Sequence, residues 1–322
     1  MTLPIHPSIS AIIPTYNAEP YLDKLLAQLH NQSIKLSEII IVDSQSSDQT
    51  ESIARRWNTR FFSIAKSDFD HGGTRNWAVK NSSSDYILFL TQDALPADGH
   101  LVENLYTVLA ADPSVAVSFA RQIPYESASP VEKFTRHFNY PDNSWIRSIH
   151  DVDKYGIKTF FLSDVCALYS RAIFDEMGGF TSPILTNEDM MMASSLLRRG
   201  YKTAYQASAI VYHSHNYTLK QQYKRNFDIG VFLAMHHDKF LVKDEVGEGL
   251  KIVKTGVCYF LSRFRLISLF QLLLSSFVKY LGNRAGHHYQ DYSLREKLKR
   301  TNYPMFWNRF YEEYGKQEKS HS

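Results

Sequence analysis

Residues 86–93 read YILFLTQD, an unbroken apolar run that stops on a threonine, a glutamine and an aspartate. A short continuous apolar run bounded by polar residues predicts a strand that is buried on both faces. The same pattern occurs upstream in three places, at 9–14 (ISAIIP), 38–43 (EIIIVD) and 61–65 (FFSIA). Residues 86–93 therefore hold the fourth strand of a series, and Asp93 follows that strand directly.

Helical patterns separate these four strands. Residues 20–30 place leucines at helical spacing behind Pro20, and residues 51–57 (ESIARRW) form a second helical pattern. A third helix is expected to start at residue 77, after a glycine-containing turn at 69–76 (FDHGGTRN). Strands that alternate with helices and are apolar throughout indicate a parallel sheet covered on both faces. The sequence predicts a doubly wound, mostly parallel α/β domain.

Polar residues follow each of the four predicted strands. They are Pro14 to Asn17 after the first, Asp43 after the second, His71 to Asn76 after the third and Asp93 after the fourth. In such sheets, ligands bind at the carboxyl ends of the strands, so we expect these residues on one rim. Asp93 alone is equally compatible with a turn, but four placements on the same side favour a ligand site.

Later segments continue the mixture of helices and strands. We predict helices at 100–113, 171–178 and 188–199, a strand at 115–122, two strands within 158–169 joined by a turn at Ser163 and Asp164, and two short strands within 201–215. No pattern assigns residues 124–150. We expect the α/β domain to span residues 1–235 and a helical, basic extension to occupy residues 236–322.

Composition limits the classes of protein that fit. The chain has 322 residues and a formal net charge of only +3, so nothing indicates a nucleic-acid partner. Cys166 and Cys258 are far apart and lie in apolar surroundings, which is typical of free thiols in a reducing compartment. The first residues lack the charged and apolar regions of a secretory signal. We therefore expect a cytoplasmic location.

The segment 250–281 has two interpretations. It is strongly apolar but carries five basic residues, and its longest charge-free run, 266–278, has thirteen residues. A spanning helix needs about 20 apolar residues. The segment is therefore expected to form one or two helices that either lie in a membrane interface or pack as core helices on the α/β domain.

Motifs of several enzyme classes are missing from the sequence. There is no GxxxxGK[ST], no GxGxxG and no GxSxG, so P-loop enzymes, ordinary dinucleotide binders and hydrolases of that type are disfavoured. Carboxylates and a histidine pair remain. Asp93 with His213 suits a divalent cation, although Asp189 is also a plausible helix-start acid and His213 a plausible core histidine. His213 and His215 form an HxH pair that is expected on a strand, so their rings should point to opposite faces and at most one should be a ligand.

The motifs, taken in order, resemble a known family. IIPTYN, IIIVDSQSSDQT, GGTRN, LFLTQDA, NEDMMMASSLLRRGYK and VYH resemble the family 2 glycosyltransferases of the GT-A fold over about residues 8–235. HGGTRN together with TQDA is most similar to the bacterial rhamnosyltransferase branch. The resemblance implies a GT-A nucleotide-sugar domain at 1–235.

The resemblance also implies roles for individual residues. Pro14, Thr15 and Tyr16 match the loop around the nucleotide base, and Asp43 matches the acid that accepts from the pyrimidine N3–H. Arg75 matches an arginine near the base and phosphates. Asp93 matches the last acid of the DxD metal motif, His213 matches a further metal ligand, and Glu188 and Asp189 match the ED motif, whose second acid is the general base. Gln92 is a candidate for the ribose or sugar. Ser163 and Asp164 are candidates for sugar hydroxyl groups and equally for a plain turn. Thr91 stands where the family has the first acid of DxD.

The implied reaction is an inverting transfer of L-rhamnose from dTDP-rhamnose, dependent on Mg²⁺ or Mn²⁺. The implied acceptor is a glycan or a saccharide on a polyprenyl diphosphate, which would place the protein peripherally at the inner face of the cell membrane. A UDP-hexose donor remains open within the same family. A non-catalytic nucleotide-sugar-binding assembly protein is the rival from another class. A nucleotidyltransferase is disfavoured because PTYNAEP lacks a glycine-rich phosphate loop.

Overall fold

The computed structural model describes residues 7–240 and 246–320 of the chain. These residues form two compact units. The first unit runs to Thr181 and resumes at Glu188–His215, and the second comprises Ser182–Asn187 and the chain from Asn216 onward. Each unit has its own buried core.

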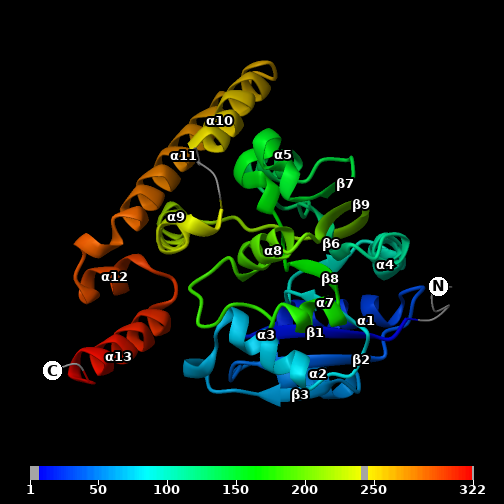
Figure 1. Ribbon diagram of the computed structural model, residues 1–322. Coiled ribbons are helices and arrows are strands. Elements are labelled where there is room, and N and C mark those ends of the chain that lie inside the picture. The colour runs from blue at the N-terminus through cyan, green and yellow to red at the C-terminus, as the bar shows by residue number, and fades with distance from the viewer. Residues whose placement is uncertain (1–6, 241–245, 321–322) are drawn as a thin grey trace. The chain divides into compact units, whose positions relative to one another are not determined.

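The first unit is built on one mixed sheet (Figure 1). Its strands are β1 (Ile9–Thr15), β2 (Glu38–Asp43), β3 (Arg60–Ser63), β4 (Tyr86–Leu90), β5 (Leu95–Pro96), β6 (Val115–Ile123), β7 (Trp145–Arg147), β8 (Cys166–Ser170) and β9 (Lys202–Tyr212). They are ordered β3-β2-β1-β4-β8-β6-β9-β5, with β7 paired to β9. The first four strands pair in parallel, as predicted. The antiparallel pairs β4–β8 and β6–β8 then make the sheet mixed.

Eight α-helices of this unit lie among the described residues. They are α1 (Glu19–His30), α2 (Thr50–Arg56), α3 (His71–Lys80), α4 (Leu101–Ala111), α5 (Pro130–Asn139), α6 (Val152–Tyr155), α7 (Arg171–Glu176) and α8 (Glu188–Arg198). The predicted leucine stripe of α1 is buried in the same core as the inner residues of β1, β2 and β4. The strands are thus held with their carboxyl ends at one rim, which is where the candidate site lies.

Three local predictions were wrong. Residues 69–76 are not a turn, because α3 already begins at His71, where the Asp70 side chain caps it by accepting a 2.6 Å hydrogen bond from the Gly73 amide. Position 72 requires glycine, because the Cβ of any other residue would lie only 2.1 Å from the carbonyl oxygen of Thr181.

The other two errors concern strands. The segment Gly156–Phe160 is a 3₁₀ helix, and the strand β8 starts only at Cys166. A short apolar run does not distinguish a buried strand from a buried helical turn. Residues 202–212 form the single strand β9 rather than two. Its pairing with β6 passes from Ala120–Gln206 to Arg121–Ile210, so residues 207–209 form a bulge within the strand.

The second unit is helical and contains the predicted C-terminal extension. Its helices are α9 (Leu219–Met235), α10 (Val246–Leu261), α11 (Leu266–His287), α12 (Leu294–Arg300) and α13 (Pro304–Ser320). Trp307 is fully buried with Leu185, Phe227 and Val231 at the centre of its core. Helices α10 and α11 run side by side as a hairpin (Figure 1).

Glycines let α9 and α11 approach each other closely. A Cβ on Gly282 would lie 2.4 Å from the Tyr223 carbonyl oxygen, and one on Gly286 would lie 2.2 Å from the Phe227 carbonyl oxygen. On α9, a Cβ on Gly230 would lie 2.2 Å from the Asn283 carbonyl oxygen. Because these neighbours are backbone atoms, they move only if the helices separate.

We therefore expect Gly286→Ala to lower the free energy of unfolding by about 1–3 kcal/mol, the usual cost of overpacking a tight contact. Gly249→Ala on α10 is the matched control, since no atom lies within 4 Å of its added Cβ. In that helix alanine is expected to stabilise by roughly 0.5–1 kcal/mol. Urea unfolding followed by circular dichroism measures both. Equal stability of the two variants would contradict the close contact.

Candidate active site

The first two strands end in a connected polar loop. The Thr15 hydroxyl at the end of β1 donates to Asp43 Oδ1 at 2.9 Å, and the Ser46 amide donates to Asp43 Oδ2 at 2.7 Å. Asp43 is buried, so these bonds fix the carboxylate and the loop that follows β2. An ionised carboxylate has about four acceptor positions. Asp43 therefore keeps capacity for another donor, and its predicted role toward a pyrimidine stays a prediction.

Tyr16 and Gln92 join the ends of β1 and β4. The Tyr16 amide donates to Gln92 Oε1 at 2.8 Å, and Gln92 Nε2 donates to the Tyr16 carbonyl at 3.1 Å. Lys66 lies over the exposed Tyr16 ring, with Nζ 4.0 Å from the ring centre and 2.7 Å from the hydroxyl oxygen. The sequence analysis missed Lys66. It brings a positive charge to the loop that the resemblance assigns to the nucleotide.

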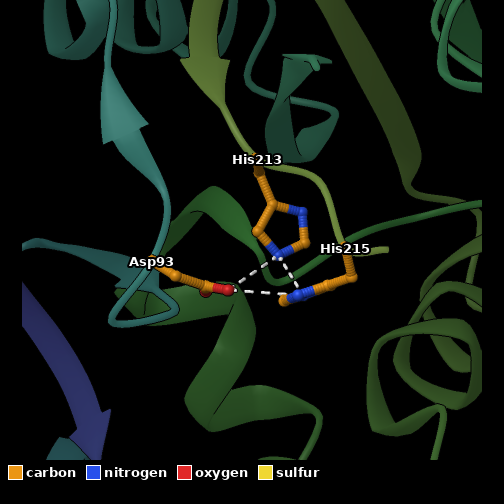
Figure 2. A group of neighbouring side chains, drawn as sticks. All are labelled: Asp93, His213 and His215. Atoms are coloured by element: carbon orange, nitrogen blue, oxygen red, sulfur yellow. Dashed lines mark hydrogen bonds and ion pairs between the residues drawn. The ribbon is translucent and has the colours of Figure 1, made fainter. Parts of the chain in front are cut away.

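Asp93, His213 and His215 converge at the rim (Figure 2). Asp93 Oδ2 lies 3.5 Å from His213 Nε2 and 3.3 Å from His215 Nε2, and the two Nε2 atoms are 3.1 Å apart. Adjacent ligands on one ion have about this spacing when metal–ligand bonds are roughly 2.1 Å long. The predicted pair Asp93–His213 is therefore brought together, and it gains a third member.

The expectation that only one histidine of the pair faces the site was wrong. It assumed that both residues lie on a strand, whereas β9 ends at Tyr212. Beyond that residue the chain is irregular, so alternation of side chains no longer applies. His215 turns back to within contact of His213, and the two rings meet edge to face with centroids 4.7 Å apart.

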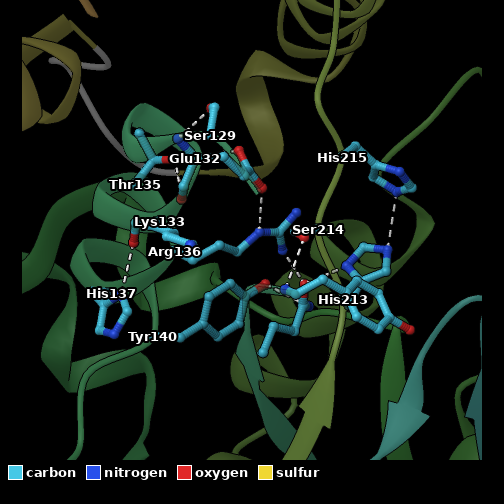
Figure 3. A network of polar contacts seen from close by, with 12 residues as sticks. Ser129, Glu132, Lys133, Thr135, Arg136, His137, Tyr140, His213, Ser214 and His215 are labelled. Atoms are coloured by element: carbon cyan, nitrogen blue, oxygen red, sulfur yellow. Dashed lines mark hydrogen bonds and ion pairs between the residues drawn. The ribbon is translucent and has the colours of Figure 1, made fainter. Parts of the chain in front are cut away.

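A buried glutamine, Gln122, orients His213. It belongs to a polar network that also holds Arg136 and Tyr140 (Figure 3). Gln122 Oε1 lies 2.8 Å from His213 Nδ1 and also accepts from the Arg136 guanidinium, while Gln122 Nε2 donates to Tyr140 and Ser163. Arginine only donates, so the atom facing it is the amide oxygen, and His213 Nδ1 must donate to that oxygen as well. The other ring nitrogen, Nε2, is then the one that would offer its lone pair to a cation, and without a cation it lies where it can donate to Asp93. This is the usual arrangement of a metal-binding histidine.

The charge of Asp93 also suits a cation. Burial alone would raise the pKa of its carboxyl group, but the neighbouring imidazoles of His213 and His215 outweigh burial and hold the pKa well below its ordinary value. Asp93 is therefore ionised at neutral pH. One carboxylate and two imidazoles form a donor set that fits Mn²⁺ and related divalent ions.

A second cluster holds three acids around the start of α8. Asp189 Oδ2 accepts from the Asp164 amide at 3.3 Å, and Tyr169 donates to Asp164 Oδ1 at 2.7 Å. Glu188 Oε1 lies 3.0 Å from Arg75 NH1 in a buried ion pair. The Arg75 guanidinium therefore contacts Glu188, and its predicted contact with a diphosphate stays a prediction.

The acids of this cluster differ in protonation. Burial, together with the charge of Asp189, raises the pKa of Asp164 well above its ordinary value. Among the described residues Asp164 Oδ2 has no hydrogen-bond partner, which fits a protonated carboxyl group. Burial and the neighbouring Glu188 carboxylate raise the pKa of Asp189 to about 7. Asp189 is half-buried, whereas its neighbour Glu188 is buried. A carboxylate with a pKa near neutrality is well matched to proton abstraction.

Ser163 and Asp164 link the two clusters. The Ser163 hydroxyl accepts from Gln122 at 2.9 Å, and Gln122 in turn holds His213. The next residue, Asp164, bonds Asp189 through its amide. A single dipeptide thus ties the candidate metal ligands to the candidate base. Gln122 was missed by the sequence analysis because nothing local marks a strand glutamine as the partner of a histidine 91 residues away.

Comparison with known proteins identifies the family of the chain. A family model described as glycosyl transferase family 2 matches residues 10–178. The chain is 39% identical over 305 residues to the O-antigen chain rhamnosyltransferase RfbN of Salmonella typhimurium, covering 93% of this chain and 96% of that one. It is 38% identical to the O-antigen chain rhamnosyltransferase WbaN of Salmonella anatum, covering 94% and 96%.

Solved structures show the same fold at low identity. The mannosyltransferase PcManGT of Pyrobaculum calidifontis, in complex with GDP-Man and Mn²⁺, superposes with a TM-score of 0.54 at 16% identity, covering 95% of this chain and 87% of that chain. TarS 1–349 of S. aureus, in complex with UDP-GlcNAc, gives a TM-score of 0.53 at 14% identity and covers 88% and 92%. The GT-A-type fold expected from the motifs is confirmed.

Proposed function

The chain belongs to glycosyl transferase family 2 and is a glycosyltransferase of the GT-A fold, and from that premise we propose that it transfers L-rhamnose from dTDP-rhamnose to a hydroxyl group of a saccharide. We choose rhamnose because the chain is similar to two O-antigen chain rhamnosyltransferases over nearly their whole length. The linked clusters around Asp93 and Asp189 carry the choice of chemistry.

Asp189 is the general base in this proposal. It takes the proton of the acceptor hydroxyl group while that oxygen bonds to the anomeric carbon, and the bond from that carbon to the diphosphate oxygen breaks on the opposite face. Glu188, which is paired with Arg75, helps Asp189 to act as the base because its charge raises the pKa of Asp189 toward neutrality. Configuration at the anomeric carbon inverts, and no covalent enzyme intermediate forms.

Asp93, His213 and His215 would hold a divalent cation, either Mn²⁺ or Mg²⁺. Such an ion supplies positive charge that stabilises a leaving diphosphate. The two imidazoles favour Mn²⁺, because Mg²⁺ prefers oxygen ligands. His215 would supply a third ligand at a site where Thr91 stands in the place of the first acid of DxD. The base-binding roles of Pro14, Thr15, Tyr16 and Asp43 belong to the same proposal.

The donor is tested with a panel of dTDP-rhamnose, UDP-glucose and UDP-galactose. We expect kcat/KM for dTDP-rhamnose to exceed that for each UDP-hexose by roughly 10–200-fold, the range that small differences in substrate groups provide. Donor hydrolysis measured by release of free nucleotide serves as the readout. A faster reaction with either UDP-hexose would overturn the donor. Tight dTDP binding without turnover of any donor would instead favour a non-catalytic assembly protein.

We further propose that the acceptor is a glycan, in the form of a saccharide on a polyprenyl diphosphate, and that the protein works in the cytoplasm at the inner face of the membrane. Support comes from the O-antigen relatives, which are named for a chain of sugars. Extraction of lipid-linked saccharides from cells lacking the protein tests this. Accumulation of an acceptor one sugar short is the expected result, and an unchanged lipid fraction would contradict it.

A further inference from the structure

Helix α11 has its large apolar side chains on the outside. The residues that it buries against the rest of the second unit are mostly small, and they are Ser268, Leu272, Ser275, Gly282 and Gly286. The residues on the opposite side are large and apolar, and with Phe264 at the hairpin tip they form what we call the outward face: Phe264, Ile267, Phe270, Leu274, Phe277 and Leu281. Phe264 is 90% exposed and Ile267 78%. A helix in a protein core shows the reverse arrangement.

The outward face is continuous along the helix. From Ile267 to Leu281 its members recur at alternating intervals of three and four residues, which aligns them on one side of an α-helix. Contiguous exposed apolar surface of this kind marks a site of interaction. It is therefore a candidate docking surface for a partner that presents an apolar interior.

Charge identifies the partner. Residues 249–290 contain six basic residues and no aspartate or glutamate. Arg263 and Arg265 flank Phe264 at the tip of the α10–α11 hairpin, and Arg284 lies on the exposed surface near the other end of α11. An apolar stripe between exposed arginines matches a bilayer surface, where acyl chains lie beneath anionic headgroups. A protein partner would need an acidic rim around an apolar groove of the same length.

The length of the charge-free run in α11 bears on whether the helix could cross a membrane. Among the described helices α11 alone combines the length and mean hydropathy of a membrane span. Its charge-free run of thirteen residues, however, covers only about 20 Å at 1.5 Å per residue, against roughly 30 Å of hydrocarbon. Its C-terminal half is also bound to the polar helix α9 through Gly282 and Gly286. We infer that the outward face of α11 binds the surface of an anionic bilayer with the helix axis in the membrane plane.

Vesicle flotation of the full chain tests the inference. We expect binding to vesicles of phosphatidylcholine with phosphatidylglycerol, weaker binding to phosphatidylcholine alone, and weakening by added salt. The combined variant Ile267→Ser, Phe270→Ser and Phe277→Ser should lower the partition coefficient by about tenfold or more. The matched control carries Ile146→Ser and Leu219→Ser, two exposed apolar residues outside this face, and should bind as the wild type does.

Further measurements separate the alternatives. Arg263→Gln with Arg265→Gln, both at exposed positions, should reduce binding to the anionic vesicles only. Donor hydrolysis without vesicles should be unchanged in every variant, so failure of the membrane inference is distinguishable from failure of the proposed reaction. Undiminished flotation of the triple-serine variant would overturn the inference. A different result would assign the face to a second copy of the chain. In that case light scattering would show that the wild type is a dimer and the triple-serine variant a monomer, and neither protein would float with vesicles.

Discussion

Replacing Asp189 with asparagine is expected to lower kcat by about 10²–10⁴-fold while leaving donor binding intact. The asparagine amide has the same size as the carboxylate, but it cannot take the proton from the hydroxyl group of the acceptor saccharide. Asp189 accepts from the Asp164 amide through Oδ2 and from the Met190 amide through Oδ1, so the asparagine keeps one of these two bonds through its remaining oxygen. Turnover is measured by release of the nucleotide, and donor affinity by calorimetry on the same preparation.

The pH dependence of kcat gives the same assignment an independent test. Because burial and Glu188 raise the pKa of Asp189 to about 7, the base is protonated below that pH and inactive. The wild-type kcat should fall on the acid side of pH 7, approaching tenfold for each unit. Glu188→Gln removes a charge that raises the pKa, so the acid limb should move to lower pH.

Two results would remove Asp189 from the role of base. One is an unchanged kcat in the asparagine variant, and the other is an acid limb that stays in place in Glu188→Gln. Asp175→Asn is the control for loss of a carboxylate, because Asp175 lies on the surface in an i,i+4 pair with Arg171. Thermal melts of Glu188→Gln check that Arg75, left without its partner, does not unfold the site.

The half of the sheet that starts the chain was predictable because each strand is written as an apolar run. β1, β2, β3 and β4 all lie where the sequence placed them, and Asp43 and Asp93 follow their strands as expected. The antiparallel strand β8 was harder, because the run before it, with Thr159 and Phe160 fully buried, is equally apolar in a 3₁₀ helix. The local sequence of a strand does not determine which neighbouring strand it pairs with.

The candidate site also has residues that sequence motifs mark and residues that they do not mark. Ordered motifs mark Asp93, Asp189 and His213 as candidates in the sequence, and their roles stay predictions. Gln122 and Lys66 were missed, and His215 was considered only as an alternative to His213. Each of the three contacts a partner that the chain reaches only after folding. His215 depends on where β9 ends, and Lys66 joins Tyr16 across 50 residues. Their chemistry was visible in the sequence, but their placement was not.

Replacing Asp93 with asparagine is expected to abolish metal-dependent turnover to below about one hundredth of the wild-type rate, since several kcal/mol of charge stabilisation are at stake. Asp93 is the carboxylate of the cluster with His213 and His215, and its charge is what an ion between the three ligands requires. Calorimetric titration with Mn²⁺ measures affinity directly. Treatment with a chelator should reproduce the loss in the wild type, with recovery on adding Mn²⁺ more complete than on adding Mg²⁺.

His215→Ala and Gln122→Met separate ligand from support. If both imidazoles bind the ion, His215→Ala weakens Mn²⁺ affinity more than Gln122→Met does, because the latter only loosens the orientation of His213 and costs about 10–100-fold. His100→Ala is the control, since that histidine also lies beside a carboxylate, Glu103, but is exposed and has no second imidazole next to it in the described structure. Mn²⁺ binding that is equal in Asp93→Asn, His215→Ala and wild type would place the ion elsewhere. Two imidazoles would then be packed against one carboxylate for structural reasons, and Asp189 would have to act without a cation at this rim.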